Sequence, residues 1–191
     1  MIRITTLLIV ISFLFAHPHT FIDYEATAVF DDNGISGVET TWYFDEMFSS
    51  VVETYDENGD KKFSPAETKL LKAEAFDNLK EYNYFTKFYV SGSEFVPAEI
   101  SDFEAFFNDN NIAYKFFIPC RVSAGNQTSE LLIMFYDPTY YIHVDPMDNK
   151  ALGLKNEKGY AVEVVHEKKK EYAYYQRAII PEGFRVWFQK Q

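Results

Sequence analysis

Two segments of this sequence carry side chains that could bind metal ions. Near the start, His17-Pro18-His19 follows an apolar stretch, and Asp23 lies four residues after the second histidine. Clustered imidazole nitrogens suit Zn, Ni, Co or Cu. Further along, residues 56–67 carry oxygen-bearing side chains at Asp56, Asn58, Asp60, Ser64 and Glu67, and such oxygens suit a hard ion such as calcium. The sequence therefore predicts two different kinds of metal site in one chain, one for a transition ion and one for calcium.

The acidic segment has the ligand spacing of an EF-hand loop. Oxygen ligands fall at loop positions 1, 3, 5 and 12, namely Asp56, Asn58, Asp60 and Glu67. The carbonyl of Lys62 and the hydroxyl of Ser64 complete the predicted shell. Lys61 departs from the pattern, because it stands where the turn prefers glycine and a left-handed side-chain-bearing residue costs about 1 kcal/mol. We expect a structural calcium ion of modest affinity; the alternative is a solvated acidic turn that holds no ion.

The histidine motif has the alternation of a strand. If residues 17–24 are extended, one face carries His17, His19, Phe21 and Asp23. Cα atoms two residues apart on a strand are roughly 6.6 Å apart, so both rings could converge on one ion, with Asp23 in a supporting role. His143-Val144-Asp145 repeats this arrangement, which makes His143 the best remote partner. The alternatives are a functionless chain end and, for His143, an ordinary polar strand position.

Residues 1–16 have the layout of a cleaved secretory signal. Arg3 precedes an apolar run at residues 7–15 that ends at Ala16, and this run is shorter than the roughly 20 residues that span a bilayer. Cleavage after Ala16 would make His17 the first residue and add its α-amino group to the potential ligands. We therefore expect a periplasmic or otherwise exported protein that is not embedded in a membrane after cleavage.

Composition bounds the remaining function classes. Hydrophobic residues make up 47% of the chain, which excludes a disordered protein, and the net charge of -11 disfavours nucleic-acid binding while it attracts cations. Cys120 is the single cysteine and lies in an apolar run, so we expect a buried, inert thiol. The basic residues 168–170 are expected to form a solvated turn.

Hydrophobic periodicity predicts an α+β fold, an antiparallel β-rich single domain over residues 17–191. Helical spacing at residues 47–55 and 71–82 flanks the acidic loop, so we expect an EF-hand-like helix-loop-helix insertion at residues 45–82. The predicted strands are residues 20–30, 35–44, 86–91, 113–122, 131–136, 140–144, 160–165 and 184–188.

Several stretches together resemble one protein family. They are HPHTFID at 17–23, TWYFDEMF at 41–48, the acidic loop, NLKEYNYF at 78–85 and FYDPTYY at 135–141. In this order they resemble the DUF1007 family of bacterial exported proteins, which are often labelled periplasmic components of uncharacterised ABC-type transport systems. The resemblance implies an association with nickel, cobalt or zinc transporters. His17, His19 and Asp23 match the family's opening motif, and Lys61 stands at the glycine position of its acidic loop.

Three hypotheses of function follow. The first is a metal-handling accessory protein that binds Zn, Ni, Co or Cu through His17 and His19, contains calcium, and serves a membrane metal transporter. The second is a calcium-stabilised structural or interaction domain whose histidines bind no transition ion. The third is a copper-dependent oxygenase with a chain-initial histidine, which needs a remote histidine such as His143 or His166. The sequence has no nucleophile–base pair, phosphate loop or HExxH motif, so we expect no catalytic residues.

Overall fold

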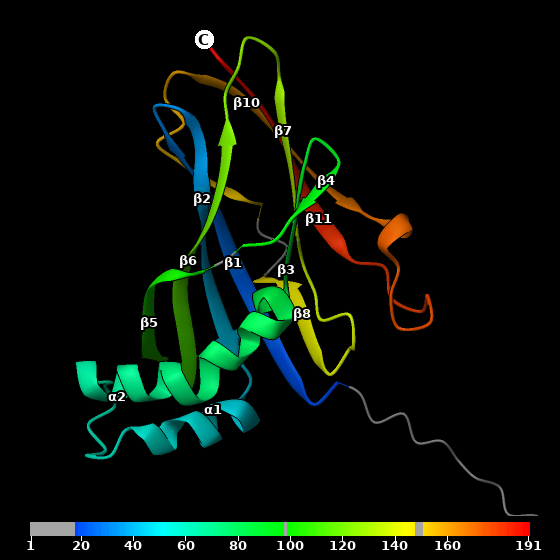
Figure 1. Cartoon of the computed structure of the whole chain (residues 1–191). Coiled ribbons are helices and arrows are strands. Elements are labelled where there is room, and N and C mark those ends of the chain that lie inside the picture. Colours follow the sequence, from blue (N-terminus) through cyan, green and yellow to red (C-terminus); the bar gives the residue numbers. More distant parts are fainter. Residues whose placement is uncertain (1–17, 98, 148–150) are drawn as a thin grey trace, which may run out of the picture.

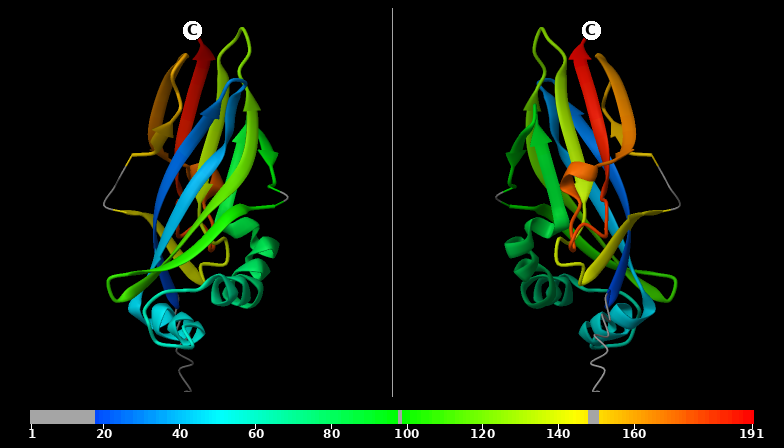
Figure 2. Two further views of the ribbon diagram at one scale, coloured as in Figure 1. Left: turned by 90° about the vertical axis from the view of Figure 1, so that its left-hand side faces the viewer. Right: turned by 90° about the vertical axis from the view of Figure 1, so that its right-hand side faces the viewer.

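The structure, a computed structural model, describes residues 18–97, 99–147 and 151–191. The predicted leader and His17 therefore lie outside the described residues. The chain forms two sheets that run lengthwise through the molecule, with the helices at one end (Figures 1 and 2). The first sheet contains β1 (Thr20–Asp31), β2 (Gly34–Phe44), β5 (Ser101–Asn108), β6 (Asn111–Ser123), β8 (Ile142–Pro146) and β9 (Gly153–Lys155). The second contains β3 (Thr86–Val90), β4 (Ser93–Phe95), β7 (Ser129–Phe135), β10 (Tyr160–Lys168) and β11 (Glu182–Lys190).

The strand order shows which segments are neighbours. The first sheet has the order β5-β6-β2-β1-β8, and β9 pairs with β1 further along. The second has the order β10-β11-β7-β3-β4. Pairing is antiparallel except that β8 and β9 both run parallel to β1. The α+β, β-rich prediction is thus confirmed, while the purely antiparallel arrangement is wrong at this edge.

The core lies between the two sheets because one face of each strand is apolar. Along β1 every second residue is buried, starting from Thr20 and Ile22. Trp42 and Phe116 from the first sheet belong to the same buried cluster as Phe88 and Phe184 from the second. Burying a large apolar side chain stabilises the fold by about 1.5–3 kcal/mol. This aromatic core explains how a chain without a disulfide can remain folded.

Cys120 is fully buried, as predicted. Burial raises the pKa of its thiol to about 12, because the charged thiolate would lose its hydration. The reactive thiolate form is therefore suppressed at neutral pH.

The short helices begin at capping residues. Helix α1 (Glu46–Val52) continues into a 3₁₀ turn, η1 (Glu53–Tyr55), and its N-cap is Asp45. Helix α2 (Pro65–Leu71) has Ser64 as N-cap and proline in its first turn. It continues through a π turn, η2 (Lys72–Phe76), and a 3₁₀ segment, η3 (Asp77–Phe85). These elements bury Leu71 and Phe76 against the core.

Several boundaries differ from the prediction. The second helical segment begins at Pro65 rather than at residue 71, because the capping box at Ser64 starts a helix inside the acidic segment. Strands β4, β5 and β9 lie outside the predicted strands; β4 and β9 have three residues each, too few for alternation to be visible. Lys169 does not belong to a solvated turn: it is 3% exposed, and its ammonium lies 2.5 Å from Glu167.

Within the described residues, no helix is both long enough and apolar enough to cross a bilayer.

Candidate functional site

The acidic segment between η1 and α2 is organised around the carboxylate of Asp56. Its Oδ1 accepts hydrogen bonds from the backbone N–H groups of Gly59 at 3.0 Å and Asp60 at 3.2 Å. Its Oδ2 accepts from the N–H of Lys61 at 2.9 Å. Asp56 is 9% exposed, so these contacts fix a nearly buried carboxylate at the first position of the loop.

The next two oxygen-bearing side chains repeat this pattern. Asn58 Oδ1 accepts from the N–H of Asp60 at 2.9 Å, and Asp60 Oδ1 accepts from the N–H of Lys62 at 2.9 Å. Each side chain therefore folds back onto the backbone two residues later. The side chains at loop positions 1, 3 and 5 therefore all accept hydrogen bonds from the backbone N–H groups of residues 59–62.

Glu67 joins the two ends of the loop. Its carboxylate accepts from the N–H of Glu57 at 3.0 Å and from the N–H of Ser64 at 2.7 Å, while its own N–H donates to Ser64 Oγ at 3.3 Å. A contact of its carboxylate with the Ser64 hydroxyl contributes most, and the N–H groups of Ser64 and Glu57 add to it; these interactions lower the pKa of Glu67 below its ordinary value because they favour the charged form. Glu67 is thus ionised and positioned beside both ends of the acidic segment.

Lys61 adopts the left-handed conformation that its loop position requires, with φ of 61°. Its ammonium forms an ion pair with Glu53 of η1 and lies 5.0 Å from the centroid of the Phe107 ring. Phe63, two residues later, stacks on the same ring at 5.0 Å. The side chains of Lys61 and Phe63 thus both contact the Phe107 ring, and these contacts accompany the left-handed backbone conformation of Lys61.

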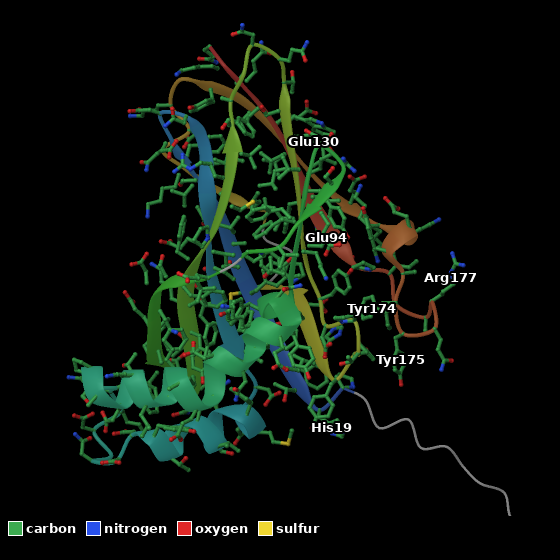
Figure 3. All side chains as sticks on the ribbon, viewed as in Figure 1. His19, Glu94, Glu130, Tyr174, Tyr175 and Arg177 are labelled. Atoms are coloured by element: carbon green, nitrogen blue, oxygen red, sulfur yellow. The ribbon has the colours of Figure 1, made fainter. Side chains whose placement is uncertain are left out.

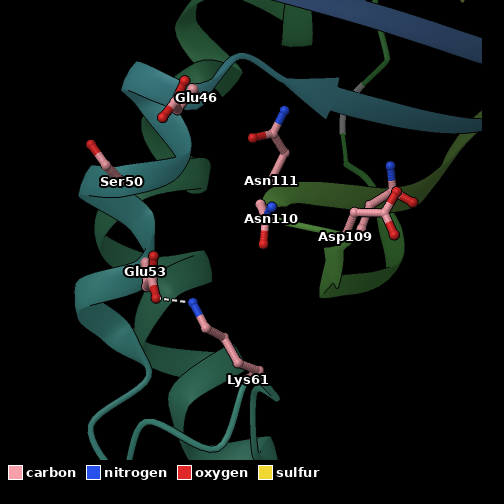
Figure 4. A pocket seen from close by; sticks show the side chains of 8 residues that line it. Glu46, Ser50, Glu53, Lys61, Asp109, Asn110 and Asn111 are labelled. Carbon is pink, nitrogen blue, oxygen red and sulfur yellow. Dashed lines mark hydrogen bonds and ion pairs between the residues drawn. The ribbon is translucent and has the colours of Figure 1, made fainter.

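A polar cleft adjoins the loop (Figure 4). Helix α1 contributes Glu46 and Ser50, Glu53 and Lys61 point toward each other, and the turn at residues 108–111 between β5 and β6 lies on the other side. The Lys61–Glu53 ion pair crosses one side of this cleft. The cleft is acidic overall, and its one lysine is already paired.

The second candidate region is the exposed face at the start of β1. His19 and Asp23 are exposed and Phe21 is 50% exposed, whereas Thr20 and Ile22 are buried, so the two sets lie on opposite faces as the alternation predicted. Figure 3 shows His19 at the helical end of the molecule, far from Glu130. This exposed face starts at His19, which follows Pro18, the first residue that the structure describes.

Strand β8 adds further ligand-type residues to this face. It pairs with β1 in parallel, with Phe21 opposite His143 and Asp23 opposite Asp145. Paired residues of neighbouring strands project to the same side of a sheet. The structure therefore brings His143 and Asp145 beside the strand that carries His19, although the two segments are far apart in the sequence.

The ring of His143 is already engaged. Its Nε2 lies 2.6 Å from Asp145 Oδ2, and its Nδ1 is buried without a hydrogen-bond partner among the described residues. The ring contacts Phe21 edge-on, with centroids 5.7 Å apart. In residues 18–97, 99–147 and 151–191, no three His, Cys, Asp or Glu side chains converge as a metal-ligand group. His143 would have to rotate its ring before it could share an ion with His19.

His166 does not join this face. It lies on β10 in the second sheet, where its Nε2 is 2.9 Å from Glu182 and its ring stacks on Phe184 at 4.5 Å. His166 is exposed, and one side of its ring lies against Phe184. The structure thus separates His166 from the histidines of the first sheet.

One residue that the sequence argument missed holds His143 in place. Asp137 is 2% exposed and accepts hydrogen bonds from Thr139 N–H at 2.9 Å, Tyr141 N–H at 3.0 Å and Ile142 N–H at 3.0 Å. The hydroxyl of Thr139 also donates to it at 2.7 Å. This carboxylate closes the turn between β7 and β8, and the Asp-Pro-Thr sequence was the available signal for it.

Comparison with known sequences places the chain in a family. A family model described as "Protein of unknown function (DUF1007)" matches residues 2–183. The chain belongs to the DUF1007 family. An "Uncharacterized 15.5 kDa protein in trpE 3'region" of Spirochaeta aurantia is 30% identical over 140 residues, 72% of this chain and 98% of the relative. An "Uncharacterized protein" of Haemophilus influenzae is 27% identical over 165 residues, 83% of this chain and 79% of the relative.

In this DUF1007 chain two of the motifs that carried the resemblance meet in space. Residues 20–23 of the opening motif lie on β1, and the segment Trp42–Asp45 comprises the end of the neighbouring strand β2 and the residue after it. Trp42 is fully buried in the core, whereas Asp45 caps α1 and contacts the backbone of Phe21. The helical end and the histidine face are therefore connected through Asp45.

Proposed function

We propose that this DUF1007 protein is an exported metal-handling accessory protein, which binds a transition ion at the start of β1 and exchanges it with a membrane metal transporter. The observation that supports this proposal best is the parallel pairing of β1 with β8. Because of it, His19 and Asp23 share an exposed face with His143 and Asp145. Two imidazoles and two carboxylates on one face offer donors that suit Zn, Ni, Co or Cu.

Each residue has a distinct role in the proposed site. His17, with its α-amino group after cleavage, and His19 would supply the nitrogen ligands. Asp23 would orient a ligand. His143 would join as a further ligand once its ring has turned to present one nitrogen to the ion, and the other nitrogen would keep its contact with Asp145. An exposed face with few ligands suits transfer of an ion, because an incoming partner can supply donors of its own.

The acidic segment is proposed to bind calcium as an EF-hand-like loop. The oxygens of Asp56, Asn58 and Asp60 already lie on one turn of backbone, and Glu67 is positioned across both loop ends. The Lys62 carbonyl and Ser64 would complete the shell. Calcium here would stabilise the helical end of the fold.

The second candidate function is a calcium-stabilised structural or interaction domain without transition-metal chemistry. The engaged ring of His143 favours it, because Nε2 contacts Asp145 and Nδ1 is enclosed. The two candidates differ in one measurable property, which is binding of a transition ion at the chain start.

Zinc titration of the mature protein from His17 tests the proposal. Protons compete for imidazoles, which titrate near about 6.5, and for an α-amino group, which titrates near about 7.7–8.0. Zinc affinity should therefore fall steeply between roughly pH 8 and pH 5.5. Replacing both His17 and His19 by alanine should eliminate binding, whereas His166→Ala, the matched control, should leave it unchanged. Unchanged affinity in the double variant would favour the second candidate.

A further inference from the structure

Asp45 makes more contacts than a helix cap needs. Its Oδ1 accepts from the N–H of Phe48 at 2.8 Å, which is the ordinary capping bond of α1. Its Oδ2 accepts from the N–H of Phe21 at 2.6 Å, and its own N–H donates to the carbonyl of Phe21 at 3.2 Å. One residue therefore binds helix α1 with one oxygen and strand β1 with the other.

These contacts come where the β1–β2 ladder ends. The last pair of that ladder is Ile22 with Phe44, so the backbone of Phe21 has no strand partner on the β2 side. Asp45 takes the place of that partner. Because Phe21 lies between His19 and Asp23, the orientation of the proposed ligand stretch on this side depends on Asp45.

The other end of α1 connects to the acidic loop. The helix continues into η1, and the N–H of Asp56 donates to the carbonyl of Glu53 at 3.0 Å. Glu53 also pairs with Lys61 inside the loop. Helix α1 has seven residues, too few to be stable alone, so its order depends on what holds its two ends.

We propose that Asp45 is a positioning residue for the N-terminal ligand stretch, and that through α1 it couples this stretch to the acidic loop. Without a cation the carboxylates of Asp56, Asp60 and Glu67 repel one another, and this repulsion loosens the end of α1. Calcium removes the repulsion, orders α1, and thereby holds Asp45 against Phe21. The coupling rests on the proposed calcium and transition-ion sites; the contact of Asp45 with Phe21 does not.

Amide hydrogen exchange at Phe21 measures the positioning directly and needs no transition ion. In the mature protein, saturating calcium should slow exchange of this amide severalfold. Asp45→Ser keeps a good N-cap but lacks the second oxygen, so exchange at Phe21 should become at least tenfold faster and insensitive to calcium. Ser36→Ala, which removes a hydrogen bond to Val29 at the far end of β1, is the matched control and should leave Phe21 unchanged.

Zinc titration with and without calcium measures the coupling. Calcium should tighten zinc binding about fivefold or more in the wild-type protein, and by linkage zinc should tighten calcium binding by the same factor. In Asp45→Ser the factor should fall to about one while both ions still bind. In Ser36→Ala it should keep its wild-type value.

The outcomes separate the inference from the function on which it rests. Absence of zinc binding would refute the proposed transition-ion function, and Phe21 exchange would still decide the role of Asp45. The coupling is overturned if calcium raises the Tm of the wild-type protein but leaves Phe21 exchange unchanged. The positioning role is overturned if Asp45→Ser leaves that exchange as slow as in the wild-type protein. Circular dichroism of Asp45→Ser verifies that this variant is folded, so a global loss of structure is recognised.

Discussion

The acidic loop and the histidine face are both rich in potential ligands, but they are assembled in different ways. The loop takes all its oxygens from residues 56–67, and hydrogen bonds between near neighbours in sequence hold them in place. The face combines β1 with β8, and a buried carboxylate in a distant turn sets the position of β8. A local site depends mainly on its own residues, whereas the face depends on contacts made elsewhere.

The largest effect is expected from removing the carboxylate that holds the β7–β8 turn. Asp137→Ala leaves several partly buried N–H and O–H donors without their acceptor, so the unfolding free energy should drop by about 3 kcal/mol. Urea denaturation measures this loss. The calcium-dependent stabilisation should survive, because the acidic loop lies elsewhere; its disappearance would contradict the independence of the loop. Asp137→Asn keeps one acceptor and should lose about half as much.

Removing the last acidic residue of the loop should have the next largest effect. Calcium at a hundredfold excess over its dissociation constant stabilises a folded protein by about 2.7 kcal/mol. Glu67→Ala should abolish the calcium-dependent rise in Tm. Zinc should still bind this variant, with the affinity of the calcium-free wild-type protein. If calcium does not change the Tm of the wild-type protein, the loop is an acidic turn that binds no calcium.

Glu67 also predicts a pH dependence of stability in the calcium-free protein. Because folding lowers the pKa of Glu67, its stabilising contribution is present above the ordinary value of 4.5 and is lost as pH falls through the lowered pKa. Glu67→Gln, which cannot ionise, should lack this part of the acid sensitivity. Thermal melts from pH 6 to 3 compare the two proteins, and identical pH profiles would contradict the prediction.

His143→Ala tests whether the distant strand β8 contributes a ligand to the transition-ion site. If His143 joins the ion with His17 and His19, its loss should weaken zinc binding about tenfold, or about 1.4 kcal/mol. Zinc titration measures this change, and His166→Ala on the other sheet is the control. An unchanged affinity would limit the ligand set to the chain start.

The smallest effect is expected at Lys61. Lys61→Gly removes the strain of a left-handed side-chain-bearing residue, which costs about 1 kcal/mol. It also removes the exposed ion pair with Glu53, which stabilises the fold by at most about 1 kcal/mol. The free energy of unfolding should therefore rise by less than about 1 kcal/mol. Lys61→Ala removes the same ion pair and keeps the strain, so the difference between the two variants isolates the backbone term. Equal urea midpoints for glycine and alanine would refute the strain argument.

The sequence by itself determined the features that depend on local spacing. Alternation assigned His19 and Ile22 to opposite faces of one strand, and the apolar run around Cys120 predicted its burial. The spacing of the acidic residues predicted a calcium-binding loop, which stays a prediction; in the structure Asn58 and Asp60 accept hydrogen bonds from the backbone two residues later. Such features follow from a few neighbouring residues, so the sequence is sufficient to recognise them.

Only the tertiary structure decided which distant segments meet. The parallel pairing of β8 with β1, the engagement of His143 with Asp145, and the placement of His166 on the second sheet have no local signal. The double contact of Asp45 with α1 and Phe21 is of the same kind, since an aspartate before a helix predicts a cap but not the strand beside it. Strand register and neighbour choice depend on how the whole aromatic core packs, and residues far apart in the sequence supply that core.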